Sequence, residues 1–169
     1  YKTHRQNIID GLSRKEFFLS KLSFAAFLAL VSAAFLFLLG LVLGLINSES
    51  GLSAFTNSLV FIPGHAIQLF CFFLFSILLV LIIRRSGITI VLLLIYSLIL
   101  EPILSALLKW QVPELGSVLP LDSIASIIRI PFSKYILLQT QDYIAWMDLL
   151  RCGVWGLIFT ALIFLILKK

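Results

Sequence analysis

The run LSFAAFLALVSAAFLFLLGLVLGLI, residues 22–46, decides the fold, because it is long and apolar enough to cross a lipid bilayer as one helix. The hydrocarbon core of a bilayer is about 30 Å thick, and a helix needs about 20 apolar residues to cross it. No charged residue and no proline interrupts the run. The stretch therefore predicts a transmembrane helix, and with it an integral membrane protein.

The composition of the whole chain supports this interpretation. Of 169 residues, 61% are hydrophobic and 12% are charged, and the mean hydropathy is +1.12. A soluble domain of this size needs more charge on its surface. The net charge of +5 comes from Lys and Arg beside apolar runs, where they orient helices and meet anionic headgroups. We therefore expect membrane lipids, and no nucleic acid, as partners.

Three further runs reach membrane-spanning length, at residues 60–83, 88–108 and 149–167. With residues 22–46 they predict an all-α fold, a polytopic transmembrane helical bundle that forms a single domain over residues 1–169. The chain begins with Tyr1 rather than Met, and its start lacks the pattern of a signal peptide. From this we expect upstream residues to be missing.

Positive charge lies on alternate flanks of the four runs. The first and last flanks and the link between the second and third runs hold two acids, Asp10 and Glu16, and nine basic residues: Lys2, Arg5, Arg14, Lys15, Lys21, Arg84, Arg85, Lys168 and Lys169. Under the positive-inside rule these flanks are cytoplasmic. The sequence thus predicts a multi-pass protein whose visible ends, including the C-terminus, are cytoplasmic.

The outer segment at residues 109–148 is too apolar for a solvated loop. Between Pro120 and Pro131, apolar residues recur at helical spacing and predict a short amphipathic helix at the outer membrane surface: Leu121, Ile124, Ile127 and Ile128. Aromatic residues expected to anchor at the headgroup level flank this helix: Trp110, Tyr143 and Trp146.

The opening residues 1–13 predict a short cytoplasmic helix with an apolar edge formed by Ile8, Ile9 and Leu12. Gly11 suits the left-handed position after a helix, and Ser13 with Glu16 has the spacing of a capping box that starts the next helix. Neither Pro nor Gly follows before Gly40. The second helix therefore continues into the first span, and the two are expected to move together.

Three stretches carry a family resemblance. RQNIIDGLSRKEFFLSKL resembles the coupling helix and following span of type-2 ABC transporter permeases. YSLILEPIL and LPLDSIASII resemble the fifth span and outer re-entrant region of bacterial members of that family. The resemblance implies that the four spans are the third to sixth of six, with two spans and an N-terminal interfacial helix absent.

The same resemblance implies a function and partners. The chain is expected to be the permease of an ATP-driven exporter in the cytoplasmic (inner) membrane, paired with a second permease subunit as a homo- or heterodimer. ATP and Mg are expected on a partner ATPase. The residues implied in coupling to that ATPase are Ile8, Ile9, Asp10, Gly11 and Leu12.

No catalytic site is expected on this chain, since it contains no His-Glu-x-x-His, Gly-x-Ser-x-Gly or Walker-type motif. No cofactor or metal site is expected either, because Cys71 and Cys152 lack metal-ligand spacing and are interpreted as buried packing residues. An alternative from another class is a non-transporting scaffold or assembly subunit that uses the same opening helix to dock a cytoplasmic partner.

Glu101 is the one acid deep within a predicted span, where charge is costly. It either faces a cavity on the transport pathway, or pairs with Arg129 or Arg151 and accompanies a kink at Pro102. His65 and Gln68, after Pro63 and Gly64, could line an outer gate. Their ordinary interpretation is that they satisfy polar groups where the second span begins.

Gly40 and Gly44 continue a stripe of small residues formed by Ala25, Ala29 and Ala33. Such stripes let transmembrane helices approach closely. We expect this face to pack against a helix of the same subunit rather than form a dimer seam.

Overall fold

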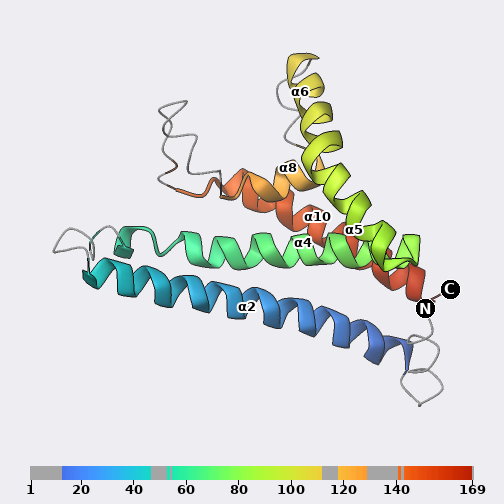
Figure 1. Cartoon of the computed structure of the whole chain (residues 1–169), viewed down its shortest axis with the longest axis horizontal. Helices are drawn as coiled ribbons and strands as arrows, with labels where there is room; N and C mark the ends of the chain where they lie inside the picture. The colour runs from blue at the N-terminus through green and yellow to red at the C-terminus, as the bar shows by residue number, and fades with distance from the viewer. Residues whose placement is uncertain are drawn as a thin grey trace.

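The computed structural model describes residues 13–46, 53, 55–111, 118–128, 141 and 143–168, and within them it contains helices and no strand. In Figure 1 the helices of the first, second and fourth spans run beside one another, whereas the helices of the third span lean away from them. In chain order the helical elements are α2 (Arg14–Ile46), α4 (Phe61–Ile83), α5 (Ser86–Ile95), η1 (Tyr96–Leu100), α6 (Glu101–Gln111), α8 (Pro120–Ala125) and α10 (Trp146–Lys168).

Four segments are long and apolar enough to cross a membrane: Lys15–Ile46, Phe61–Ile83, Gly87–Trp110 and Trp146–Lys168. The predicted all-α polytopic bundle is therefore confirmed, and the protein is a multi-pass membrane protein. The helix of the first span begins at Arg14 and continues to Ile46, as predicted from the Ser13–Glu16 spacing and the absence of Pro and Gly before Gly40.

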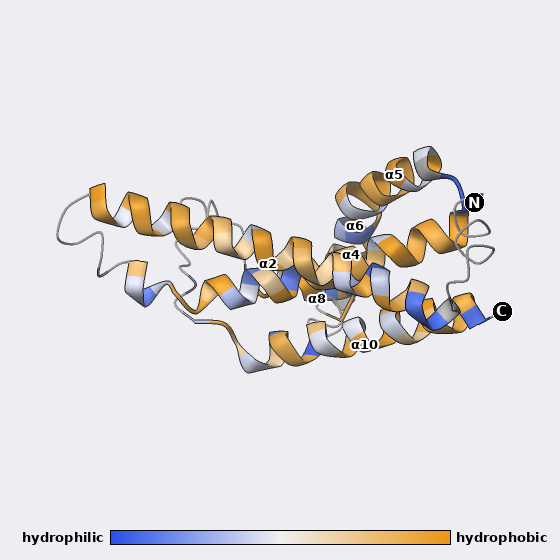
Figure 2. Cartoon of the chain, turned by 90° about the horizontal axis from the view of Figure 1, so that it is seen from below, coloured by the Kyte–Doolittle hydropathy of each residue, from blue (hydrophilic) through white to orange (hydrophobic). Residues whose placement is uncertain are grey.

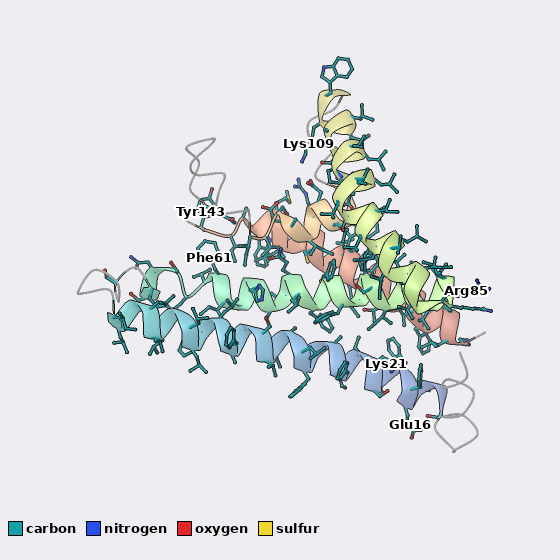
Figure 3. All side chains as sticks on the ribbon, in the orientation of Figure 1. Glu16, Lys21, Phe61, Arg85, Lys109 and Tyr143 are labelled. Carbon is teal, nitrogen blue, oxygen red and sulfur yellow. The ribbon has the colours of Figure 1, made fainter. Side chains whose placement is uncertain are left out.

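Successive spans alternate in direction, so basic residues from distant parts of the sequence share one end of the molecule (Figure 1). Lys21 and Arg85 lie at this end, whereas Phe61 and Tyr143 lie at the other (Figure 3). Figure 2 shows the hydrophobic colour along most of α2, α4, α5 and α10, and the hydrophilic colour where α5 begins and α10 ends. The charge pattern of the sequence thus becomes a basic end of the bundle.

The start of α2 is held by the predicted capping box. The Ser13 backbone N–H donates to Glu16 Oε2 at 2.7 Å, and the Glu16 backbone N–H donates to Ser13 Oγ at 3.3 Å. Two of the donors that a helix start leaves without partners are satisfied in this way. From this cap α2 continues for 33 residues without a break.

Small residues of α2 face α4 and allow close packing between these two spans. Ala25, Ala29 and Ala33 are all buried, and α2 and α4 are in contact. At the far end of α2, Gly44 is buried, and a Cβ added at Gly40 would lie 2.7 Å from the Phe55 ring. Close approach and dispersion are the main source of helix association in lipid, so this stripe joins α2 to its own chain.

The centre of the bundle lies between α4 and α10. Cys71 and Cys152 are both free and buried, as predicted, and the Cys71 thiol donates to the Cys152 carbonyl oxygen at 3.7 Å. A Cβ on Gly156 would lie 3.2 Å from Cys71 Sγ, so glycine permits this approach. Phe75 contacts Phe159 with ring centroids 5.4 Å apart and completes the packing.

The third span changes its helical geometry in the middle. α5 packs on α4, η1 is a π-helical turn, and α6 then ends well away from the other spans (Figure 1). Pro102 is the second residue of α6, and because proline has no backbone N–H it cannot bond to the carbonyl one turn earlier. A wide turn beside such a residue is a known way to accommodate the missing bond. Tyr96 still contacts Phe75, with centroids 5.5 Å apart.

The outer helix differs from its prediction. Helical spacing predicted a helix through Ile128 on the membrane surface, but α8 ends at Ala125, and Ile124 and Ile127 are only 3% and 0% exposed. α8 contacts α4, α6 and α10. These two side chains therefore pack against neighbouring helices, because α8 lies in the space that opens where α6 leaves α4, and the depth of α8 in a bilayer stays a prediction.

The aromatic residues predicted as anchors, Trp110, Tyr143 and Trp146, are all exposed, and their depth in a bilayer stays a prediction.

Candidate functional site

A cavity of about 410 Å³ lies between α4, the third span and α8. It is lined in part by His65, Gln68 and Phe72 of α4, Ser97 of η1, Glu101 of α6 and Asp122 of α8. We call it the Glu101 cavity. Its position follows from the fold, since α5 stays against α4 while α6 diverges and is contacted by α8 instead.

The three residues singled out in the sequence for a pathway meet in this cavity. His65 and Gln68 lie on one helix and Glu101 on another, yet all three line the same space. The sequence named all three as possible pathway residues, with His65 and Gln68 together where the second span begins, but it did not place Glu101 beside them. Their role in transport stays a prediction, whereas their juxtaposition is a property of the structure.

Glu101 is buried, as predicted, with 3% of its surface exposed. Its Oε1 accepts the backbone N–H of Asp122 at 2.6 Å. That N–H belongs to the first turn of α8, whose N-cap residue Leu119 makes no side-chain capping bond. A carboxylate is a favourable partner for such a donor, so Glu101 supplies from another helix the cap that α8 lacks.

The second carboxylate oxygen, Oε2, is buried and has no hydrogen-bond partner in the part of the chain that the structure describes. Of the two arginines suggested by the sequence, Arg151 pairs instead with Asp148, with Nη1 and Oδ1 3.5 Å apart. Arg129 lies outside the described residues. The pairing with Arg151 is thus contradicted, and the neighbours of the Glu101 carboxyl are instead the start of α8 and the Tyr96 hydroxyl.

Asp122 contributes a second carboxylate whose charge is already balanced. Lys109 Nζ lies 3.1 Å from Asp122 Oδ2 and 3.3 Å from Oδ1, and this pair joins α6 to α8. The lysine side chain is 46% exposed and the aspartate 28%. Glu101 is therefore the carboxyl of the cavity without a basic partner among the described side chains.

His65 connects the cavity to α2. Its Nε2 lies 3.1 Å from Ser32 Oγ, a distance at which one of the two atoms donates a hydrogen bond to the other. Ser32 follows Ala25 by seven residues and Ala29 by three, so at about 100° per residue it lies on the same packed face of α2. A displacement of α2 along α4 would therefore shift the His65 side chain, which lines the cavity.

Several residues of the site were missed in the sequence. Ser32, Ser97 and Asp122 are short polar residues in apolar surroundings, and such residues often only bond to their own helix backbone. Pro120 and Asp122 in the first turn of α8 indicated a helix start, but nothing indicated that its cap is Glu101.

The predicted coupling residues, Ile8, Ile9, Asp10, Gly11 and Leu12, lie outside the described residues. Among the residues that are described, no three His, Cys, Asp or Glu side chains come together in a way that could hold a metal ion.

Comparisons with protein-family models, curated proteins and solved structures find no match to this chain.

Proposed function

We propose that the chain is the membrane-spanning permease subunit of an ATP-driven ABC transporter that exports a substrate across the cytoplasmic membrane. ATP and Mg²⁺ are bound and used by a partner ATPase, so the permease itself is not an enzyme. The observation that carries this proposal is the capped, uninterrupted α2 helix, which begins next to the segment that resembles a coupling helix.

The geometry of α2 suits transmission of movement from one end of the bundle to the other. At 1.5 Å per residue its 33 residues extend about 50 Å. An ATPase that displaces residues 1–12 would move the N-terminal end of α2. Because the helix has no break, the displacement reaches the buried stripe around Ala29 without loss at a hinge.

The bond between Ser32 and His65 connects a movement of α2 to the Glu101 cavity. Ser32 lies on α2, and His65 lies on α4 and lines the Glu101 cavity. Alternation between two arrangements of α2 against α4 would change the shape of that cavity, which is the kind of two-state switch on which alternating access depends. We assign the Glu101 cavity to the substrate pathway on this basis.

The orientation follows from charge. Lys21 and Arg85 share one end of the bundle with the C-terminal end of α10, and we propose that this end and the C-terminus face the cytoplasm. The exposed apolar faces of α2 and α5, with Phe27 and Val91 among them, suit contact with lipid or with a second permease subunit in a homo- or heterodimer.

Docking of the ATPase provides the test. Ile9→Asp puts a charge on the apolar edge of the opening segment, whereas Asn7→Asp adds the same charge on its polar side and serves as the matched control. Each variant is reconstituted in nanodiscs with the P-loop ATPase encoded beside it, and co-elution and ATP turnover are measured. We expect Ile9→Asp to lose both and Asn7→Asp to retain both.

Equal co-elution and turnover for Ile9→Asp and the wild type would contradict the proposal. Docking that is lost with Ile9→Asp, together with an ATP turnover that no substrate ever changes, would instead favour a non-transporting scaffold.

A further inference from the structure

One carboxyl oxygen beside the Glu101 cavity is buried without a hydrogen bond among the described residues. Glu101 is 3% exposed, its Oε1 is used by the Asp122 backbone N–H, and its Oε2 is buried without a hydrogen-bond partner among the described residues. A carboxyl oxygen removed from water without a donor is costly. The Tyr96 hydroxyl already interacts with the Glu101 carboxyl, and a further group that satisfies Oε2 would donate a hydrogen bond or carry positive charge.

The surroundings favour positive charge over a neutral donor. The neighbouring carboxylate of Asp122 is paired with Lys109, so an ionised Glu101 would have no opposite charge among the described groups of the cavity. The other polar groups of the cavity are His65, Gln68 and Ser97, and none of these brings a fixed positive charge. Inside a bundle of apolar helices an opposite charge is attracted far more strongly than in water.

The remaining walls favour an apolar body next to that charge. Leu69 and Phe72 of α4 face Leu121 and Ile124 of α8 across the cavity. The volume of about 410 Å³ falls within the range of small-molecule pockets, which are mostly apolar with a few placed polar groups.

We propose that the Glu101 cavity binds an amphiphilic cation, an ammonium group on an apolar body, with the ammonium donating to Glu101 Oε2. The inference deepens the proposed function, because it names the ligand class of the pathway. The ammonium has two possible sources, a free amphiphilic amine or the headgroup of phosphatidylethanolamine, which share this chemistry.

The test uses three probes with one apolar body and different heads: phenylbutylamine, phenylbutanol and phenylbutyrate. Binding to the full chain in phosphatidylglycerol nanodiscs is measured by equilibrium dialysis, and empty nanodiscs give the partition into lipid that is subtracted. We expect the amine to bind the wild type about tenfold or more tightly than the alcohol, and the acid to bind least.

Glu101→Gln removes the charge but keeps an oxygen for the Asp122 N–H, so the α8 cap is retained. We expect it to abolish the preference for the amine. Asp148→Asn is the matched control, because Asp148 is also buried but pairs with Arg151, and it should preserve the preference. The comparison of the three heads on the wild type needs no variant and stands even if Glu101→Gln folds poorly.

A second set of nanodiscs containing phosphatidylethanolamine separates the sources. Weaker apparent amine binding in these discs than in phosphatidylglycerol alone identifies the lipid headgroup as a competing occupant, and equal binding identifies a free amine; both results support a cation site.

Equal binding of amine and alcohol to the wild type, or an amine preference that survives Glu101→Gln, would overturn the proposal. Amine binding by Arg129→Gln but not by the wild type would also overturn the proposal. In that case Arg129 of the chain itself would be the cation that occupies the site.

The binding measurement needs no ATPase and the docking measurement needs no ligand, so failure of this inference is distinguishable from failure of the proposed function.

Discussion

Removal of the Glu101 side chain should release the start of α8. In the structure the Asp122 N–H donates to Glu101 Oε1 at 2.6 Å and caps this short helix, and the Leu121 N–H also interacts with the Glu101 carboxyl. A hydrogen bond to a charged acceptor contributes about 1.5–3 kcal/mol. The Lys109–Asp122 pair, which also holds α8, is partly exposed and contributes at most about 1 kcal/mol, so it cannot replace the lost bond.

We therefore expect Glu101→Ala to lower the free energy of local opening at Asp122 by about 2 kcal/mol, which corresponds to about 30-fold faster amide exchange. Glu101→Gln, which retains a neutral acceptor, should lie between Glu101→Ala and the wild type. Hydrogen–deuterium exchange in nanodiscs, followed on peptides from residues 118–125, measures the effect, and peptides from residues 156–163 report any global loss of structure.

Unchanged exchange at Asp122 in Glu101→Ala, with the α10 peptides also unchanged, would refute the assignment of Glu101 as the cap of α8. Equal acceleration in the Ala and Gln variants would refute the view that the acceptor oxygen is what matters.

Three further expectations concern packing and orientation. Ala29→Leu, at a buried position between α2 and α4, should destabilise the bundle by about 1–3 kcal/mol, seen as a lower thermal midpoint in detergent. Gly156→Val should do the same, because a Cβ there lies 3.2 Å from Cys71 Sγ; adding Cys71→Ala should recover part of the loss, and full additivity of the two changes would show that they do not interact. Impermeant thiol reagents should label Ser86→Cys and Ser117→Cys from opposite sides of the membrane, and labelling of both from outside would exclude the four-span topology.

The number and order of the membrane spans could be predicted from the sequence, because they depend on the length and mean hydropathy of each apolar run. Runs such as residues 22–46 have one stable form in a bilayer, since every backbone polar group must bond within the helix. The cap at Ser13 and Glu16 was accessible for a related reason, as its partners lie three residues apart. Local spacing carries this kind of information.

The cavity could not be predicted from the sequence in the same way. Glu101 and Asp122 come together only because α6 diverges from α4 and α8 turns into the resulting space. The sequence of α8 was correctly interpreted as helical, but its apolar residues suit a lipid surface and a protein interior equally well. Ile127 shows the ambiguity, because its position gave no indication of whether protein or lipid would cover it.

The π-helical turn at Tyr96–Leu100 sets the angular phase of the third span. In an unbroken α-helix, residues advance about 100° each, so the direction of buried Thr89 would recur about 20° away at Leu100, and Glu101 would lie about 120° away. An unbroken α-helix would therefore bury Leu100 and turn Glu101 away from the bundle. In the structure Leu100 is exposed, whereas Glu101 and Ser105 are buried. The extra residue in η1 acts as a phase shift, so deleting any one residue of this turn would leave the hydropathy profile almost unaltered and rotate the carboxyl toward the acyl chains.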